Sequence, residues 1–195
     1  MTNNTINTRV RAVAVAAVLG MGLIASPALA HPGHEGGLVA GLTHPLTGLD
    51  HLLAMVAVGL WAATREAKRA WQAPAMFLSC LMVGGVLGVM TGPIAAVEPL
   101  VSGSLLVLAA LLVAAPFIGD RAGLALIGAF ALLHGHAHGG EASGMVAAYF
   151  VGFLVSSAML HLAGWRIGSA LFVSSAGRWL AGLGIGAAGL ALTFA

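Results

Sequence analysis

The chain has 195 residues, of which 59% are hydrophobic and only 7% are charged. A soluble domain carries about 25% charged residues, so this composition excludes an ordinary soluble protein and predicts an integral membrane protein. The net charge of +2 rests on very few charged side chains and indicates no nucleic-acid partner. A single cysteine, Cys80, excludes a disulfide framework and a cage of thiolate metal ligands.

Residues 1–30 have the pattern of a cleaved signal peptide. Arg9 and Arg11 form a basic start, an apolar segment covers 12–24, and small residues precede Ala30. Cleavage after Ala30 would make 31–195 a single membrane domain that begins outside the cytoplasm. The alternative is an uncleaved first membrane helix, for which the apolar segment is short.

The mature chain contains six apolar stretches that are long enough to cross a bilayer as helices. Their approximate limits are 43–63, 74–92, 98–116, 121–138, 143–164 and 177–195. We therefore expect an all-α bundle of six transmembrane helices. The basic residues fall in the linkers on one side of this bundle: Arg65, Lys68, Arg69, Arg121, Arg166 and Arg178. Because basic loops stay in the cytoplasm, both mature termini are predicted to lie outside.

Glycines recur at every fourth position in two of the predicted helices. Gly84, Gly88 and Gly92 lie in the second helix, and Gly182 and Gly186 lie in the sixth. Small residues at this spacing let membrane helices approach closely. The pattern predicts a compact bundle and is compatible with a homo-oligomer.

Two histidines and an aspartate lie at the start of the first predicted span. Pro45 disfavours a helical conformation at His44, which is therefore expected just before the helix. His51 is seven residues later, about 10.5 Å along a regular helix. Either the chain bends at Pro45 or Gly48 and both imidazoles serve one metal ion, or they act as successive stations. Asp50 is expected to ligate the ion or to orient His51, the alternative being a structural Asp–His hydrogen bond between helices.

A second group of histidines lies in the fourth predicted span. His134, His138 and Glu141 share one helical face, and an i, i+4 histidine pair can hold a metal ion. His136 points elsewhere, and its role stays open. His134 and His51 have similar depth in the membrane, so a site shared between the two helices is favoured. The alternative is a flexible histidine-rich loop that only scavenges metal.

Three further histidines are weaker candidates for metal binding. His31 and His34 would lie at the mature N-terminus, where the amine and imidazoles offer ligands, although a disordered polar tail is an equal alternative. Pro32 lacks an N–H and blocks a chelate through amide nitrogen. His161, near the inner end of the fifth span, is expected to be a hydrogen-bonded interface residue, with an exit station for the ion as the alternative.

The chain resembles the HupE/UreJ family of nickel/cobalt permeases along its whole length. Its HPLTGLDH segment matches the HPxxGxDH motif of that family at His44, Pro45, Gly48, Asp50 and His51. Its HGHAHGGE segment matches the HGxAHGxE motif at His134, Gly135, Ala137, His138, Gly139 and Glu141. The resemblance implies uptake of Ni²⁺ or Co²⁺ across the bacterial inner membrane for hydrogenase, urease or cobalamin pathways. The first motif also looks like the HX4DH signature of other nickel/cobalt transporters, but it is one residue longer.

These patterns together favour a permease that is not an enzyme and carries no prosthetic group. The chain has no GxxxxGK[ST] phosphate loop, and the membrane potential can drive a divalent cation inward. Protonated imidazoles do not bind metal, so uptake is expected to fall in acid. One rival is a zinc-dependent intramembrane hydrolase with a water activated beside Asp50 or Glu141. Another is a haem protein with His51 and His134 as axial ligands. Nickel and cobalt accept the same ligands and are not distinguished.

Overall fold

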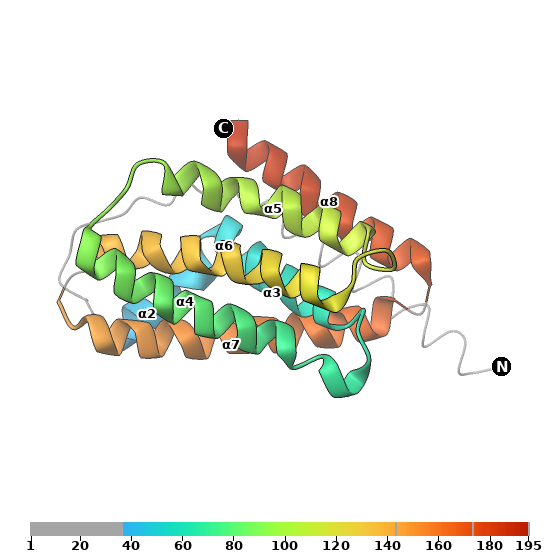
Figure 1. The fold of residues 1–195 in the computed structure, drawn as a ribbon, viewed down its shortest axis with the longest axis horizontal. Coiled ribbons are helices and arrows are strands. Elements are labelled where there is room, and N and C mark those ends of the chain that lie inside the picture. Colours follow the sequence, from blue (N-terminus) through green and yellow to red (C-terminus); the bar gives the residue numbers. More distant parts are fainter. Residues whose placement is uncertain (1–36, 143, 173, 195) are drawn as a thin grey trace.

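The computed structural model describes residues 37–142, 144–172 and 174–194, and every regular element in these segments is helical. The predicted signal peptide and residues 31–36 lie outside the described residues. The elements, drawn in Figure 1, are α2 (Leu38–Thr47), α3 (Leu49–Ala62), the 3₁₀ turn η2 (Ala67–Arg69), α4 (Gln72–Thr91), α5 (Val97–Val113), α6 (Asp120–Glu141), α7 (Val146–Leu171) and α8 (Ser175–Phe194).

The all-helical prediction is correct, and α4 to α8 match the second to sixth predicted spans. The first predicted span, 43–63, is not one regular helix: α2 and α3 form a pair bent by 83°. Among the described residues, three helical segments are long and apolar enough to cross a membrane, namely Ala67–Thr91 (η2 together with α4), Val146–Leu171 and Ser175–Phe194. The bent pair makes a fourth if it is one span. The α5 helix is shorter, and the histidines and terminal charges of α6 lower its hydropathy.

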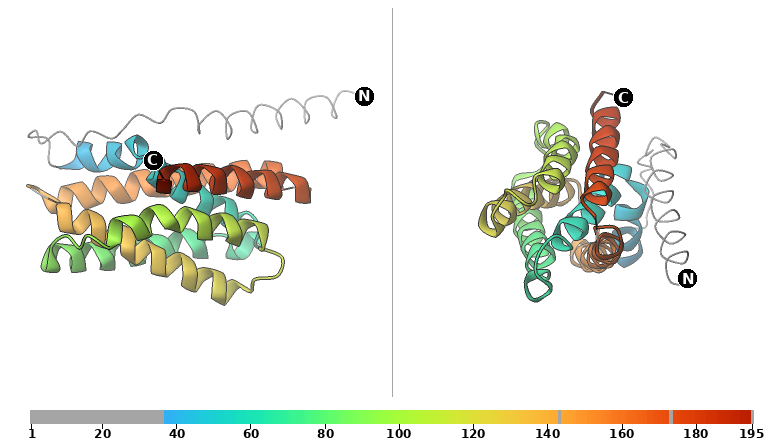
Figure 2. Two further views of the ribbon diagram at one scale, coloured as in Figure 1. Left: turned by 90° about the horizontal axis from the view of Figure 1, so that it is seen from above. Right: turned by 90° about the vertical axis from the view of Figure 1, so that its right-hand side faces the viewer.

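Helix α3 lies in the middle of the bundle. It contacts α2, α4, α5, α7 and α8, and each residue from Leu53 to Ala62 is buried. A helix that is apolar on all sides lies in a protein core or in a membrane, and the contacts of α3 place it in the core. Around α3, the strongest packing joins α4 with α6, α5 with α8, and α7 with both α2 and α3 (Figure 2).

Glycines bring α4 and α6 into direct backbone contact. A Cβ atom on Gly84 would overlap the carbonyl oxygen of Leu132, and one on Gly135 would overlap the carbonyl oxygen of Leu81. Gly88 faces the backbone of α6 in the same way. The close approach predicted from the glycine spacing is therefore present within one chain, and it fixes the height of the α6 histidines against α4.

The α3–α7 pair is held by the same device. A Cβ atom on Gly59 would overlap the carbonyl oxygen of His161, and one on Gly164 would overlap that of Val56.

Gly92, the third glycine of the α4 series, does not pack in this way. It ends α4 with a φ of 76°, and a Cβ atom there would meet no atom within 4 Å.

Arg65 ties two loops together at the basic end of the bundle. Its guanidinium donates hydrogen bonds to the carbonyl oxygens of Ala115 (2.7 Å) and Ile118 (3.1 Å), and to a carboxylate oxygen of Asp120 (3.1 Å). Arg69 donates to the other carboxylate oxygen of Asp120 at 2.9 Å. The α3–α4, α5–α6 and α7–α8 connections all lie at this end (Figure 1).

Substitution of Gly135 by alanine is expected to destabilise the bundle, because its methyl group would meet the α4 backbone rather than a flexible side chain. We expect Gly135→Ala to lower the free energy of unfolding by about 1–3 kcal/mol, as for other overpacked sites. Thermal unfolding in detergent, followed by circular dichroism, measures the change. Gly103→Ala is the matched control, since a Cβ atom there meets nothing within 4 Å. Equal melting temperatures for the two variants would contradict the close packing of α4 on α6.

Candidate metal centre

Three histidines from three helices meet in the interior. Each of His44 on α2, His51 on α3 and His138 on α6 offers a ring nitrogen, and these nitrogens all lie within 4.8 Å of one another. The ring centroid of His138 is 4.5 Å from that of His44 and 4.5 Å from that of His51. Imidazole nitrogens bind first-row transition metals at about 2.0–2.1 Å, so small side-chain rotations would bring the three nitrogens around one ion.

The bend between α2 and α3 makes this meeting possible. Of the two alternatives for His44 and His51, a bend at Gly48 is the one observed, and the ring centroids lie 5.3 Å apart. The prediction that His44 precedes the helix is wrong, because α2 begins at Leu38 and includes Pro45. Proline is tolerated there because α2 ends at Thr47, so its missing N–H removes one hydrogen bond in the last turns. The Gly48 N–H still bonds to the carbonyl oxygen of His44 at 3.3 Å.

Asp50 holds the imidazole of His51 in one orientation. Its Oδ1 lies 2.7 Å from His51 Nδ1 and also accepts the backbone N–H of His51 at 2.9 Å. An ionised carboxylate only accepts hydrogen bonds, so the ring proton belongs on Nδ1. His51 Nε2 is thereby left as the acceptor, and it is buried with no hydrogen-bonding partner among the described residues. This is the arrangement by which carboxylates orient histidines that bind metal ions.

Gly48 gives this Asp–His pair its space. A Cβ atom at residue 48 would lie 2.9 Å from His51 Nδ1 and 3.0 Å from Asp50 Oδ1. The glycine therefore serves both the bend of the chain and the hydrogen bond that follows it.

His134 lies one turn away from the three-histidine cluster along α6. Its Nδ1 donates to the carbonyl oxygen of Phe130 at 2.9 Å, and its buried Nε2 has no hydrogen-bonding partner in the described part of the chain. The ring centroids of His134 and His51 are 5.5 Å apart and the rings meet edge to face. That is not the arrangement of two axial ligands on opposite faces of one haem. His134 thus lies beside His51 with its buried Nε2 in the interior.

The remaining candidates are His136, Glu141, His31 and His34. His136 points away, as the helical spacing predicted, and its Nε2 lies 2.8 Å from Thr91 Oγ1. Glu141 is the last residue of α6, and its role as a ligand stays a prediction. His31 and His34 lie outside the described residues. Because His134 and His138 are buried within α6, the hypothesis of a flexible histidine-rich loop is wrong.

Sequence reasoning missed the aromatic side chains that border the site. The ring of Phe153 on α7 lies 4.8 Å from that of His138 and 5.8 Å from that of His44, measured between centroids. Tyr149, one turn earlier on α7, lies 5.9 Å from His44. The i, i+4 spacing of these two aromatic residues was the available signal. They place an apolar wall beside the three nitrogens, which keeps the local dielectric low.

Comparison with known proteins gives two matches. Residues 17–193 match the family described as HupE / UreJ protein. Protein HupE from Rhizobium leguminosarum bv. viciae is 38% identical over 173 residues, which cover 86% of this chain and 90% of that protein. No solved structure shows a significant match.

The geometry predicts a single tight site for a transition-metal ion. Removing any of His44, His51 or His138 is expected to weaken binding of Co²⁺ to the purified protein by at least about tenfold, because each supplies one of the three clustered nitrogens. A Co²⁺ titration followed by its visible absorption measures this affinity. His136→Ala is the control, since that ring bonds to Thr91, and it should bind as the unaltered protein does. Unchanged affinity in His51→Ala and His138→Ala would exclude the site.

Proposed function

Because the chain belongs to the HupE/UreJ family, a family of nickel/cobalt transporters, we propose that it is a permease that carries Ni²⁺ or Co²⁺ into the cell for metalloenzyme maturation. The observation that carries the proposal is the cluster of the half-buried His44 with the buried His51 and His138. Imidazole suits divalent transition metals and discriminates against Mg²⁺ and Ca²⁺, which prefer oxygen ligands.

The ion enters this site as substrate and exchanges part of its hydration shell for imidazole nitrogens. Asp50 contributes in two ways: it directs His51 Nε2 toward the ion, and its negative charge offsets part of the 2+ charge. In a low dielectric this charge matters more than it would in water. A divalent ion that moves inward gains about 4.6 kcal/mol per 100 mV of membrane potential, which is enough to drive uptake without ATP.

We further propose that the mature chain crosses the inner membrane six times, with the bent α2–α3 pair as the first span and α4 to α8 as the others. The basic residues support this orientation, because Arg65, Lys68 and Arg69 follow α3, and Arg121, Arg166 and Arg178 lie near the other connections at the same end. That end is then cytoplasmic. After removal of the signal peptide, both termini are periplasmic.

The weaker candidates fit the same pathway as accessory ligands. His31 and His34 at the mature N-terminus would capture ions in the periplasm, and Glu141 at the end of α6 would pass them toward His138. His134 would receive the ion from the cluster. A homo-oligomer needs a surface other than Gly84 and Gly88, since both pack against α6 within one chain.

Replacing Asp50 by asparagine tests the electrostatic part of the mechanism. Asparagine keeps the size and one acceptor oxygen but loses the charge, so Asp50→Asn should reduce uptake of ⁶³Ni²⁺ or ⁵⁷Co²⁺ by at least about tenfold, equivalent to about 1.4 kcal/mol. His51→Ala and His138→Ala should nearly abolish uptake at unchanged membrane abundance, whereas His136→Ala should be mild.

Two results would contradict this mechanism. Normal uptake by Asp50→Asn together with inactive His51→Ala would reduce the aspartate to a hydrogen-bonding brace. Hydrolysis of lipid or peptide by the purified protein in liposomes, without ion flux, would favour the zinc hydrolase instead.

Labelling of single cysteines in a Cys80→Ala background tests the orientation. A cysteine at Gln72, which begins α4 at the basic end, should resist an impermeant thiol reagent in intact cells. A cysteine at Ser143, in the opposite connection, should react. The reverse pattern would place the basic loops outside and overturn the proposed direction of transport.

A further inference from the structure

A fourth buried imidazole lies apart from the three-histidine cluster. His161 on α7 is only 1% exposed, and neither of its ring nitrogens has a hydrogen-bonding partner among the described residues. The expectation of a hydrogen-bonded interface residue is therefore not met. A neutral imidazole has one donor and one acceptor nitrogen, and burial of both without partners is unfavourable. A ligand that bonds to one of these nitrogens would offset this cost.

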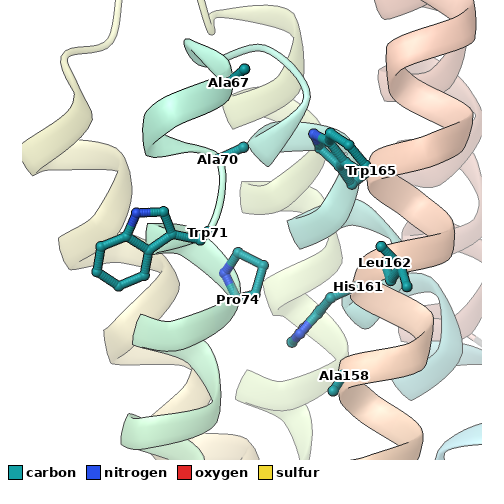
Figure 3. A pocket seen from close by; sticks show the side chains of 8 residues that line it. All are labelled: Ala67, Ala70, Trp71, Pro74, Ala158, His161, Leu162 and Trp165. Atoms are coloured by element: carbon teal, nitrogen blue, oxygen red, sulfur yellow. The ribbon is translucent and has the colours of Figure 1, made fainter.

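His161 lines a pocket at the basic end of the bundle. Figure 3 shows its ring pointing from α7 toward Pro74 at the start of α4. The pocket has a volume of about 360 Å³ and its other lining residues are Ala67, Ala70, Trp71, Pro74, Ala158, Leu162 and Trp165. Small side chains on η2 and α7 leave this space, which is large enough for a hydrated cation.

One face of α7 connects this pocket to the three-histidine cluster. Phe153, Ser157 and His161 follow one another at intervals of four residues, which is about 6 Å per step along the helix. Phe153, the residue of this face farthest from the pocket, contacts His138 of the cluster. Ser157 is fully buried, and its Oγ has no hydrogen-bonding partner in the described segments. This face of α7 therefore places the polar atoms of Ser157 and His161 between the cluster and the pocket at the basic end.

The ring of Phe77 on α4 lies between the two histidine sites. Its centroid is 5.9 Å from that of His134 and 5.1 Å from that of His161. On the side of the three-histidine cluster, His134 Nε2 has no hydrogen-bonding partner among the described residues. On the side of the pocket, neither ring nitrogen of His161 has one. Gly59 holds α3 against the backbone of His161, so the position of this imidazole is fixed by packing.

We propose that His161 is a second, weaker binding station for the transported divalent cation, located between His134 and the cytoplasmic pocket. The proposal rests on the transport function proposed above. A single imidazole with water as the remaining ligands binds a divalent cation more weakly than three imidazoles do. The ion can therefore leave the cluster for His161 and then dissociate into the pocket at the basic end. The ion moves from His134 past Phe77 and Ser157 to His161, and then regains its water in the pocket.

Binding of Co²⁺ to the purified full-length protein tests the station directly. The unaltered protein should bind one Co²⁺ tightly and a second at least about tenfold more weakly. His161→Ala should lose the weak site and keep the tight one, which also shows that the variant is folded. His161→Gln retains most of the side-chain volume and should give the same result. Met159→Ala, on α7 with an exposed side chain that does not line this pocket, is the control and should keep both sites.

Uptake into proteoliposomes gives the functional measurement. His161→Ala and His161→Gln should lower the maximal rate of Co²⁺ uptake by at least about tenfold. KM should change little, because the ion is first bound at the three-histidine cluster. Met159→Ala should transport normally.

The outcomes separate this inference from the proposed function. Wild-type uptake together with an unchanged weak site in His161→Ala would overturn the second station alone. Loss of the tight site in both His161 variants would show a structural role and would also overturn it. A weak site that depends on His161, in a protein that transports no ion, would support the station and contradict the permease.

Discussion

The 83° bend at Gly48 determines where the ligands of this protein lie. A regular helix would hold His44 and His51 about 10.5 Å apart along its axis, whereas the bend brings their ring centroids to 5.3 Å. The same glycine leaves room for the Asp50–His51 hydrogen bond directly after the bend. Helix α6 then supplies the third nitrogen, from His138, and α7 supplies the apolar wall. Both contributions meet His44 and His51 only because the bend places α2 against α7 and His44 beside His138.

Burial of unpaired imidazole nitrogens works against folding. The Nε2 atoms of His51, His134 and His138 are buried and have no hydrogen-bonding partner among the described residues, at a cost of about 1–3 kcal/mol each. Packing must offset this cost, and the backbone contacts at Gly84 and Gly135 provide close packing beside the histidines of α6. An ion that binds these nitrogens would stabilise the folded protein through its binding free energy. Stability and transport therefore make opposite demands on the same side chains.

Much of this fold follows from composition, because apolar runs of sufficient length must become helices in a membrane. The limits of α4 to α8 agree with the predicted spans to within a few residues, apart from the C-terminal end of α7. The face shared by His134 and His138 also follows from helical periodicity. The start of α2 at Leu38 and the bend do not, since Pro45 and Gly48 are each compatible with several conformations. The contacts of Phe77 and Phe153 depend on how distant helices pack, which a single sequence does not specify.

The charge of the site shapes how firmly an ion is held. Neutral imidazoles contribute no charge, and Asp50, bonded to His51, contributes one negative charge. A divalent ion in the cluster would therefore keep part of its positive charge within an apolar bundle. Full neutralisation by two carboxylates at the cluster would bind the ion more tightly and would slow its release. Incomplete neutralisation thus favours passage over retention, as a permease requires.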